Sequence, residues 1–209
     1  MINIFIADDH ELIREGFKKL IDKEPGMSVV GETDNGSDVM EFLKVKACDV
    51  IVLDITMPGK NGMDILKEIK IEFPKLKVLI LTMHPEDRFA IRALKAGASG
   101  YLTKMSASGE LIKAISKIIA GGKYISASLA ERLAFNLDQD TSAGDHHVLS
   151  DREFEVLQMI GSGKSVSEIA DKLFLTNSTV NTYRQRILEK MNMKGTADII
   201  LYAVQNNLV

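Results

Sequence analysis

Three short apolar runs in this chain lead directly into charged residues, and this feature constrains the fold more than any other. The charged residues at their ends are Asp8, Asp9, Asp54 and Lys104. Continuous apolar runs separated by helical stretches are typical of strands buried on both faces of a parallel sheet. Because the carboxyl ends of parallel strands share one edge, we expect these four side chains to meet there. Three carboxylates repel one another unless a cation lies among them, so the edge is a candidate site for a divalent metal and a phosphoryl group.

Strand-like and helix-like segments alternate through the first 120 residues. The expected strands are 2–7, 27–32, 50–53, 76–82 and 99–102. The expected helices are 11–22, 37–46, 63–73, 86–96 and 107–120, and a further amphipathic helix is expected over 126–137. Five such βα units predict an α/β fold with a five-stranded, doubly wound parallel sheet.

The pattern becomes helical throughout in the last part of the chain. The expected helices begin after Ser150, at Ser165, at Asn177 and at Thr196. A short helix, a tight turn and a longer helix with a basic end form a helix-turn-helix pattern. We therefore expect a second domain that is all-α.

Composition divides the chain into three parts: residues 1–122, a connecting helix and linker over 123–148, and residues 149–209. Residues 138–148 carry almost no apolar side chain, and as a flexible coil their ends would lie roughly 18 Å apart. The triplet Asp145-His146-His147 has the residue types of a metal site. Because no partner carboxylates stand near it in a structured segment, we interpret it as part of a solvated linker.

Charge and cysteine content narrow the functional class. The 209 residues carry a net charge of −3, and the single cysteine, Cys48, excludes an intramolecular disulfide and fits a reducing cytosol. No signal peptide and no membrane-spanning stretch is expected, so we predict a cytoplasmic protein that does not contact a membrane. From residue 149 onward seven acids balance seven bases, but positive charge gathers between Arg184 and Lys194. This local basic patch is a modest indication of nucleic-acid binding.

The first part of the chain carries Asp8-Asp9, the segment 54–59, Thr82, Tyr101 and Lys104. The last part carries the segments 149–157, 167–170 and 178–183. Through these residues the two parts together resemble a bacterial two-component response regulator of the NarL/FixJ family, with a flavodoxin-like receiver domain followed by a LuxR-type DNA-binding domain. The variant Thr-Val-Asn-Thr-Tyr-Arg in this chain is closest to the GacA/UvrY and BvgA branch.

Residue chemistry and resemblance together assign roles in the first part. Asp54 is the expected phosphoacceptor, a carboxylate nucleophile that forms an acyl phosphate, and Lys104 stabilises the phosphoryl oxygens. The expected Mg²⁺ ligands are Asp9, Asp54 and the backbone carbonyl of Thr56, with Asp8 in the outer shell. The alternatives are an Asp54 that only caps the following turn and a solvated Lys104.

Two further residues are assigned by the resemblance alone. It implies that Thr82 and Tyr101 form a switch pair, in which the threonine hydroxyl contacts the phosphate and the tyrosine turns inward. The alternative for Tyr101 is an ordinary half-buried core aromatic. His10 and His84 lie near the site in the sequence, and we interpret both as surface residues.

The helix over 177–191 is the expected DNA-recognition helix. Asn181, Thr182 and Gln185 lie opposite its apolar stripe, where asparagine and glutamine can pair with adenine. The residues expected to contact phosphates are Ser178, Thr179, Tyr183, Arg186 and Lys190. A solvated helix with ordinary polar residues is the alternative.

The chain is thus expected to be a phosphorylation-controlled transcription regulator and not an enzyme. Its expected partners are double-stranded promoter half-sites, a sensor histidine kinase and a second copy of itself. The apolar residues of the last helix fit either a dimer contact or core packing; these are Ile199, Ile200, Ala203 and Val204. The alternatives are an aspartate-dependent Mg²⁺ phosphatase of the haloacid-dehalogenase class and an unphosphorylated pseudo-receiver. Phosphatases of that class need an acid at the position of Thr56.

Overall fold

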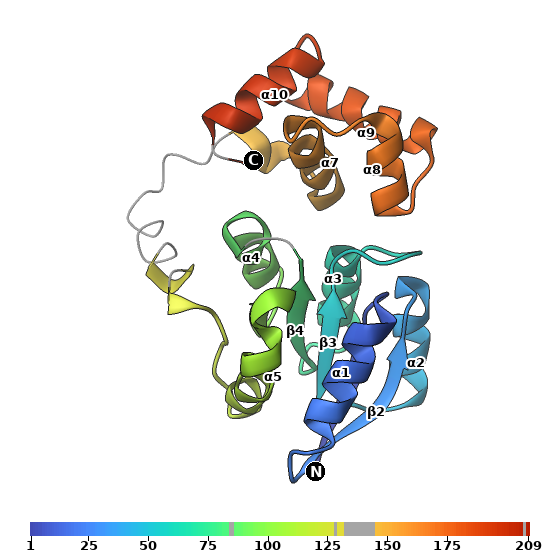
Figure 1. The fold of residues 1–209 in the computed structure, drawn as a ribbon, viewed down its shortest axis with the longest axis vertical. Coiled ribbons are helices and arrows are strands. Elements are labelled where there is room, and N and C mark those ends of the chain that lie inside the picture. The colour runs from blue at the N-terminus through green and yellow to red at the C-terminus, as the bar shows by residue number, and fades with distance from the viewer. Residues whose placement is uncertain (84–85, 128, 132–144, 207) are drawn as a thin grey trace. The chain divides into compact units, whose positions relative to one another are not determined.

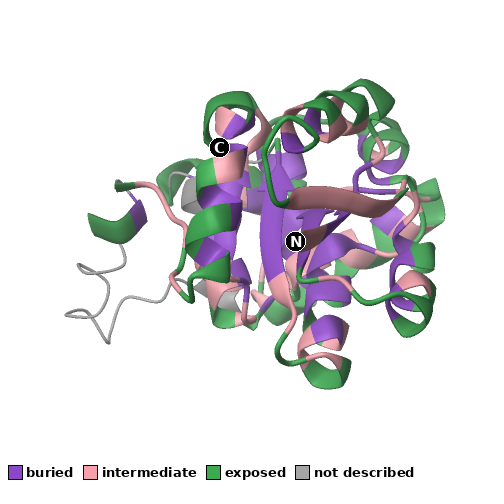
Figure 2. Ribbon diagram, turned by 90° about the horizontal axis from the view of Figure 1, so that it is seen from below, coloured by how far each residue is buried: buried purple, intermediate pink, exposed green. Residues whose placement is uncertain are grey.

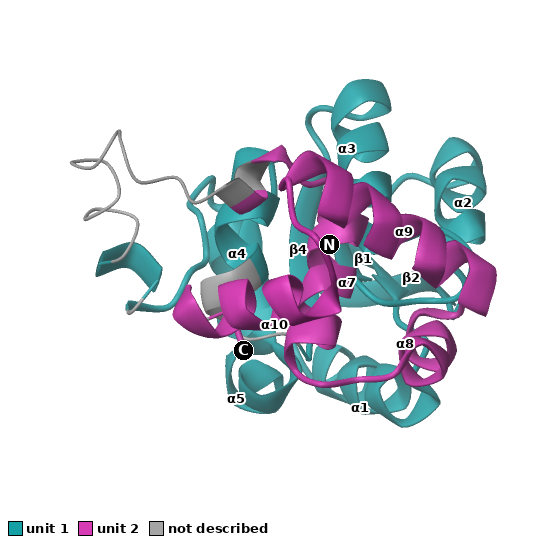
Figure 3. Cartoon of the chain, turned by 90° about the horizontal axis from the view of Figure 1, so that it is seen from above, with its two compact units in different colours: residues 1–135 teal, residues 136–209 magenta. Residues whose placement is uncertain are grey.

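The computed structural model forms two compact units, Met1–Phe135 and Asn136–Val209 (Figure 3). It describes residues 1–83, 86–127, 129–131, 145–206 and 208–209. The division predicted at residues 122 and 148 remains a prediction. None of the helices formed by the described residues combines the length and the apolar character that a membrane crossing requires.

The first unit is built on a parallel sheet (Figure 1). Its strands are β1 (Ile2–Ala7), β2 (Met27–Thr33), β3 (Val50–Asp54), β4 (Lys77–Thr82) and β5 (Gly100–Thr103). They are all parallel and lie in the order β2-β1-β3-β4-β5. The order reverses between β1 and β3, so the carboxyl ends of these strands flank a crevice of the kind that holds ligands in open α/β sheets. The predicted α/β fold is confirmed.

Helices cover both faces of this sheet (Figure 3). They are α1 (Glu11–Ile21), α2 (Val39–Val45), which follows the 3₁₀ helix η1 (Gly36–Asp38), α3 (Gly62–Glu72), α4 (Glu86–Lys95) and α5 (Lys104–Ile119). Helix α5 begins three residues before the predicted start at residue 107. The cause is Thr103, whose side-chain oxygen accepts a hydrogen bond from the backbone N–H of Ser106 and so caps the helix early.

The core of the unit follows the alternation of side chains along the strands. Figure 2 shows the buried strands enclosed by helices whose outer sides are exposed. Ile4 and Ile6 of β1 pack on one face with Phe17 of α1 and Leu111 of α5. On the opposite face Phe5 stacks on the ring of Phe42 in α2, with 3.9 Å between the ring centroids.

The chain after α5 extends the sheet before it leaves the unit. Tyr124 forms a parallel bridge with Gly100, and its backbone carbonyl accepts a hydrogen bond from the N–H of Tyr101. The amphipathic helix predicted over 126–137 is described only as far as residue 131, and Leu129 within it is buried. Two residues of its predicted stripe, Leu133 and Leu137, lie outside the described residues.

The second unit is helical, as predicted. Its helices are the 3₁₀ helix η2 (Asp145–Val148), α7 (Asp151–Gly161), α8 (Val166–Leu173), α9 (Asn177–Lys190) and α10 (Thr196–Gln205). Ser150 and Ser165 each form a capping box with the glutamate three residues later, at the starts of α7 and α8. Helix α7 packs against α8, α9 and α10.

The turn between α8 and α9 depends on Phe174. This residue has a φ of 54°, in the left-handed region that ends many helices. Thr176 then caps α9 by accepting a hydrogen bond from the backbone N–H of Thr179. The predicted helix-turn-helix order of a short helix, a tight turn and a longer helix is therefore present.

The end of the predicted linker differs from the prediction, because residues 145–148 form η2. The His146 ring stacks on Phe154 with 5.3 Å between the centroids, and its Nδ1 lies 2.9 Å from the Tyr202 hydroxyl. Those two aromatic partners lie on α7 and α10, which sequence reasoning did not place beside residue 146. The interpretation of His146 as part of a solvated linker was wrong, because its ring packs against both helices.

Candidate functional site

The predicted cluster forms at the carboxyl edge of the sheet. Asp8 and Asp9 follow β1, Asp54 ends β3, and Lys104 is the first residue of α5. The Lys104 Nζ atom lies 2.8 Å from the Asp8 carboxylate and 2.6 Å from Asp54 Oδ2. One ammonium group thus joins two carboxylates that are 46 positions apart in the sequence.

The central three groups of this cluster are shielded from water. The side chains of Asp8, Lys104 and Asp54 are 0%, 2% and 3% exposed. Burial raises the pKa of Asp54 to about 6, and the negative charge of Asp8 adds to the rise, while Lys104 opposes it. The site therefore holds one more buried acid than its ammonium group can neutralise, an arrangement that favours binding of a further cation.

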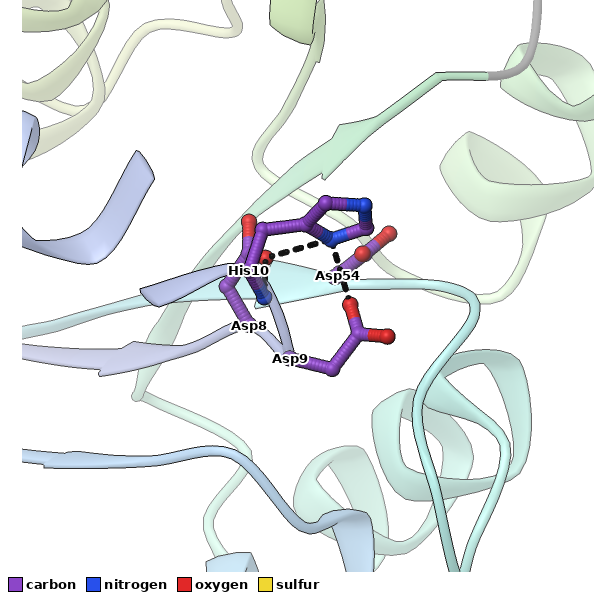
Figure 4. A group of neighbouring side chains, drawn as sticks. All are labelled: Asp8, Asp9, His10 and Asp54. Carbon is purple, nitrogen blue, oxygen red and sulfur yellow. Dashed lines mark hydrogen bonds and ion pairs between the residues drawn. The ribbon is translucent and has the colours of Figure 1, made fainter. Parts of the chain in front are cut away.

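His10 belongs to this cluster, although its side chain is 53% exposed (Figure 4). Its Nδ1 lies 2.6 Å from Asp9 Oδ1 and 3.2 Å from Lys104 Nζ, and its backbone N–H donates to Asp8 Oδ1 at 2.8 Å. The interpretation of His10 as an ordinary surface residue was incomplete, because the turn after β1 brings the ring back over the acids. Its position directly after Asp8-Asp9 was the only signal. His84 lies outside the described residues.

The donor set fits a hard divalent cation. One ligand atom from each of Asp8, Asp9, His10 and Asp54 lies within 4.8 Å of the others (Figure 4). Three of these four donors are carboxylate oxygens, which are ligands that Mg²⁺ accepts together with several waters. The Thr56 backbone N–H donates to Asp54 Oδ1 at 3.3 Å, so the loop after β3 also orients the central acid.

Glycine is required at two positions between the end of β3 and the first residue of α3. Gly59 has a φ of +77°, which the turn after Pro58 needs. A Cβ at Gly62 would lie 2.0 Å from the backbone carbonyl oxygen of Asp54, because α3 starts directly against the end of β3. The absence of a side chain at Gly62 therefore keeps Asp54 at its place in the cluster.

The residues expected to form the switch pair lie on neighbouring strands. Thr82 ends β4 opposite Thr103, and Tyr101 of β5 lies opposite Ile80. Thr82 and Tyr101 are both fully buried. Tyr101 is therefore buried more completely than the half-buried aromatic weighed as the alternative, and its ring is inside the fold.

The expected recognition helix, α9, has the predicted two faces. Val180 and Ile187 are buried, and Leu188 and Met191 are half-buried. The three residues expected to face the bases are all exposed: Asn181, Thr182 and Gln185. The Gln185 amide donates to Glu189 Oε1 at 3.0 Å, which orients this side chain along the helix.

The residues expected to contact phosphates fall into two groups. Ser178 and Arg186 are exposed, and Thr179 and Tyr183 are half-buried. Lys190 differs, because its Nζ donates to the buried Glu153 Oε2 at 2.7 Å. Its ammonium group therefore holds α9 against the start of α7, a structural role that the sequence pattern did not indicate.

Each unit matches a known protein family. Residues 4–116 match the response regulator receiver domain, and residues 147–203 match the bacterial regulatory proteins of the luxR family. The chain is a response regulator of the NarL family. It therefore belongs to the two-component transcription regulators and not to a family of phosphatases.

Other response regulators are similar to this one along the whole chain. Response regulator UvrY of Escherichia coli is 34% identical over 209 residues, covering 100% of this chain and 96% of the relative. Response regulator GacA of Pseudomonas aeruginosa is 37% identical over 212 residues, covering 100% and 98%. Their similarity bears out the expected resemblance to the GacA and UvrY branch.

Solved structures of RcsB are similar in fold to this response regulator. RcsB from Salmonella enterica serovar Typhimurium, bound to promoter P1flhDC with the phosphomimetic BeF₃⁻, aligns with a TM-score of 0.65 and 28% identity, covering 96% of this chain and 97% of that one. A structure of two RcsB dimers bound to two parallel DNAs aligns with a TM-score of 0.62 and 27% identity, covering 97% and 98%.

Proposed function

We propose that this response regulator accepts a phosphoryl group on Asp54 from a sensor histidine kinase and, once phosphorylated, binds promoter DNA as a homodimer. The observation that carries the proposal is the buried Lys104 ammonium group placed between Asp8 and Asp54. A lysine shared by two acids is poised to contact the oxygens of an incoming phosphoryl group as well. We also propose a cytoplasmic location, because the promoter DNA that the protein would bind lies in the cytoplasm.

In this reaction an Asp54 carboxylate oxygen attacks phosphorus, and the bond from phosphorus to the donor nitrogen breaks with its electron pair on the nitrogen. The product is an acyl phosphate on Asp54. Lys104 stabilises the negative charge of the transferring oxygens. Asp9, Asp54 and the Thr56 carbonyl would hold Mg²⁺, with Asp8 bound through water; the ion supplies positive charge to the phosphoryl oxygens.

The proposed switch uses Thr82 and Tyr101, which are both buried. Thr82 would donate its hydroxyl to a phosphoryl oxygen on Asp54, and Tyr101 would fill the space behind it. The added phosphoryl charge biases a two-state element of the receiver, which is how local charge changes act in regulators.

Promoter recognition is assigned to α9. Asn181, Thr182 and Gln185 would read base edges, while Ser178 and Arg186 would contact phosphates with Thr179 and Tyr183 at the edge of the contact. The RcsB dimers on DNA support a two-fold arrangement of this domain on paired half-sites.

Labelling with a small phosphodonor tests the receiver part of the proposal. Radiolabelled acetyl phosphate with Mg²⁺ should label the full chain, and Asp54→Asn should abolish the label. Glu68→Gln, which changes an acid on α3 outside the cluster, is the matched control and should label normally. Label that persists in Asp54→Asn would refute the assignment, and rapid turnover of phosphomonoesters would favour the phosphatase alternative.

DNA-site selection tests the second part. Asn181→Ala and Gln185→Ala should relax base preference by about 1–3 kcal/mol of discrimination per position, whereas Arg186→Ala should weaken all sequences alike. Beryllofluoride with Mg²⁺ should raise DNA affinity and promote dimers at fixed salt. An unchanged oligomeric state and unchanged affinity would favour the pseudo-receiver alternative.

A further inference from the structure

A cavity lies at the opposite end of the receiver's strands from the acidic cluster. It has a volume of about 730 Å³ and is bordered by the connections that lead into β3 and β4. β3 begins beside this cavity at Val50 and ends at Asp54, so the two sites lie at opposite ends of the same strand. The volume is in the range of small-molecule sites.

The body of the cavity is apolar. Leu43, Val45, Phe73, Leu76 and Ile119 are among its lining residues. Val45 is 89% exposed, although it is a branched apolar residue at the end of α2. An apolar hollow with exposed aliphatic walls gains free energy when an apolar ligand removes that surface from water.

The rim of the same cavity is basic. Lys44, Lys46, Lys75 and Lys77 line it, and among the described lining residues Asp49 is the single acid. The Asp49 carboxylate already accepts a hydrogen bond from the backbone N–H of Asn3 at 2.7 Å. A local excess of positive charge in a chain of net charge −3 points to an anionic ligand.

A smaller cavity of about 200 Å³ adjoins it and shares Pro74, Lys75 and Lys77. It is also lined by Lys70 and Lys123, and none of its described lining residues is acidic. Burial lowers the pKa of Lys70, and the neighbouring charges of Lys77 and Lys123 lower it further. This electrostatic repulsion among the lysines would be relieved by a bound anion.

Of the lysines that line the two cavities, Lys75 and Lys77 are best suited to contact such an anion, because the others named here already have partners. Lys46 and Lys70 donate to backbone carbonyls, of Val30 at 2.7 Å and of Leu76 at 2.5 Å, and are thereby held in place. For Lys75 and Lys77, which line both cavities, the described part of the chain shows no ion pair with an acid. Because both residues line the two cavities, they lie where the larger, apolar cavity meets the smaller, basic one.

We infer that this edge of the receiver binds an amphiphilic organic anion, whose apolar body lies against Phe73 and Leu76 and whose carboxylate or phosphate lies between Lys75 and Lys77. The inference goes beyond the proposed function, because it concerns a different site and a different ligand. It does not depend on phosphorylation of Asp54.

Calorimetric titration of the full chain tests this inference. The probes are decanoate and decyl phosphate below their micelle concentrations, with decanol as the neutral probe and decyltrimethylammonium as the cationic probe. Saturable binding of either anion at one site is expected, with affinity for decanol at least about tenfold weaker. Equal binding of all four probes would overturn the inference, since the lysines would then contribute nothing.

Variants separate the two parts of the site. Lys75→Glu with Lys77→Glu should weaken anion binding by at least about tenfold, and Lys113→Glu, an exposed lysine of α5 outside both cavities, should change it by less than about twofold. Ala47→Trp places a large ring at an exposed position of the lining and should abolish binding without disturbing the core. Binding that survives Ala47→Trp, or binding of inorganic phosphate as tight as that of decyl phosphate, would overturn the inference.

Discussion

At the scale of single residues, the receiver is defined by a buried imbalance of charge. Lys104 neutralises part of the charge on Asp8 and Asp54, and burial still raises the pKa of Asp54 to about 6. A buried acid that resists ionisation destabilises the folded state whenever the pH forces it to ionise. The cluster therefore lowers stability and leaves an excess of negative charge, the arrangement on which the proposed Mg²⁺ and phosphoryl site depends.

Asp54→Asn should stabilise the metal-free protein at pH 7.5, by up to about 3 kcal/mol, because it removes that ionisation. The folded pKa lies above the unfolded value, so the destabilisation by Asp54 is complete above pH 6 and disappears as the pH falls toward the ordinary value of 3.8. Urea unfolding at pH 7.5 and pH 5 measures the difference. The increase in the free energy of unfolding caused by Asp54→Asn should be smaller at pH 5, and it should also be smaller at pH 7.5 when Mg²⁺ is added. An Asp54→Asn protein less stable than the parent in EDTA at pH 7.5 would contradict this account.

Lys190 has a partner within the protein that its sequence position did not indicate, the carboxylate of Glu153. Burial acts to raise the pKa of Glu153, but hydrogen bonds from Lys190 and Ser150 outweigh it and hold the pKa below its usual value. A lowered pKa in the folded state means that the contact stabilises the protein above the unfolded pKa of 4.5 and that this contribution is lost as the pH falls.

Lys190→Met should therefore lower the free energy of unfolding at pH 7 by about 1–2 kcal/mol, because it leaves a buried carboxylate without its cation. The loss should fade below about pH 4.5. Arg186→Met on the same helix is the matched control, and it should leave stability unchanged while weakening DNA binding. If Lys190→Met weakens DNA binding without any loss of stability, Lys190 acts on phosphate as the sequence pattern first indicated.

At the scale of elements, helix starts follow local side-chain chemistry. Thr103, Ser150, Ser165 and Thr176 each cap the helix that follows through the side-chain oxygen. The turn of the helix-turn-helix does not begin with a comparable side-chain cap. It begins at Phe174, which has a left-handed backbone conformation that suits glycine better. Phe174 is also 50% exposed, so its ring contributes only part of its area to packing.

Phe174→Gly should be more stable than Phe174→Ala by about 1 kcal/mol, because only glycine adopts a φ of 54° without steric cost. Both variants lose the ring, so the comparison isolates the backbone. Thermal unfolding monitored by circular dichroism measures it. An alanine variant equal to or more stable than the glycine variant would mean that the left-handed conformation carries no strain here.

At the scale of the whole molecule, the apolar residues of α10 can be explained by core packing or by a dimer contact, and their burial separates the two. Ile199 and Ala203 are fully buried, whereas Ile200, Leu201 and Val204 are exposed. Core packing therefore accounts for one side of the helix, and the exposed side is available for the dimer contact proposed here. An exposed apolar stripe on a helix is typical of a surface that another chain covers.

Val204→Lys should weaken binding to paired half-sites by about tenfold or more, because it places a charge in the proposed two-fold contact. Val204 is 57% exposed, so the second unit should still fold. Gln205→Lys adds the same charge to α10 without removing an apolar side chain and should bind nearly as the parent does. Mobility-shift titrations on one and on two half-sites measure the effect; a Val204→Lys protein that binds two half-sites with parental affinity would exclude this face.

Much of this protein could be predicted from the order of its residues. Apolar runs ending in Asp8, Asp54 and Lys104 were sufficient to predict the parallel sheet and the shared edge, because strand burial and the direction of the carboxyl ends are local consequences of composition. The capped helices of the second unit could be predicted for the same reason, since a cap joins residues three positions apart.

Only the tertiary structure decided the contacts that join distant segments. It brought His10 back over the acids, joined Lys190 to Glu153 and set His146 against Tyr202 and Phe154, which periodicity does not encode. It also raised the pKa of Asp54, because desolvation depends on everything packed around a group rather than on its neighbours in sequence. The lysine-rimmed cavity arises in the same way, from two connections whose ends the parallel sheet places side by side.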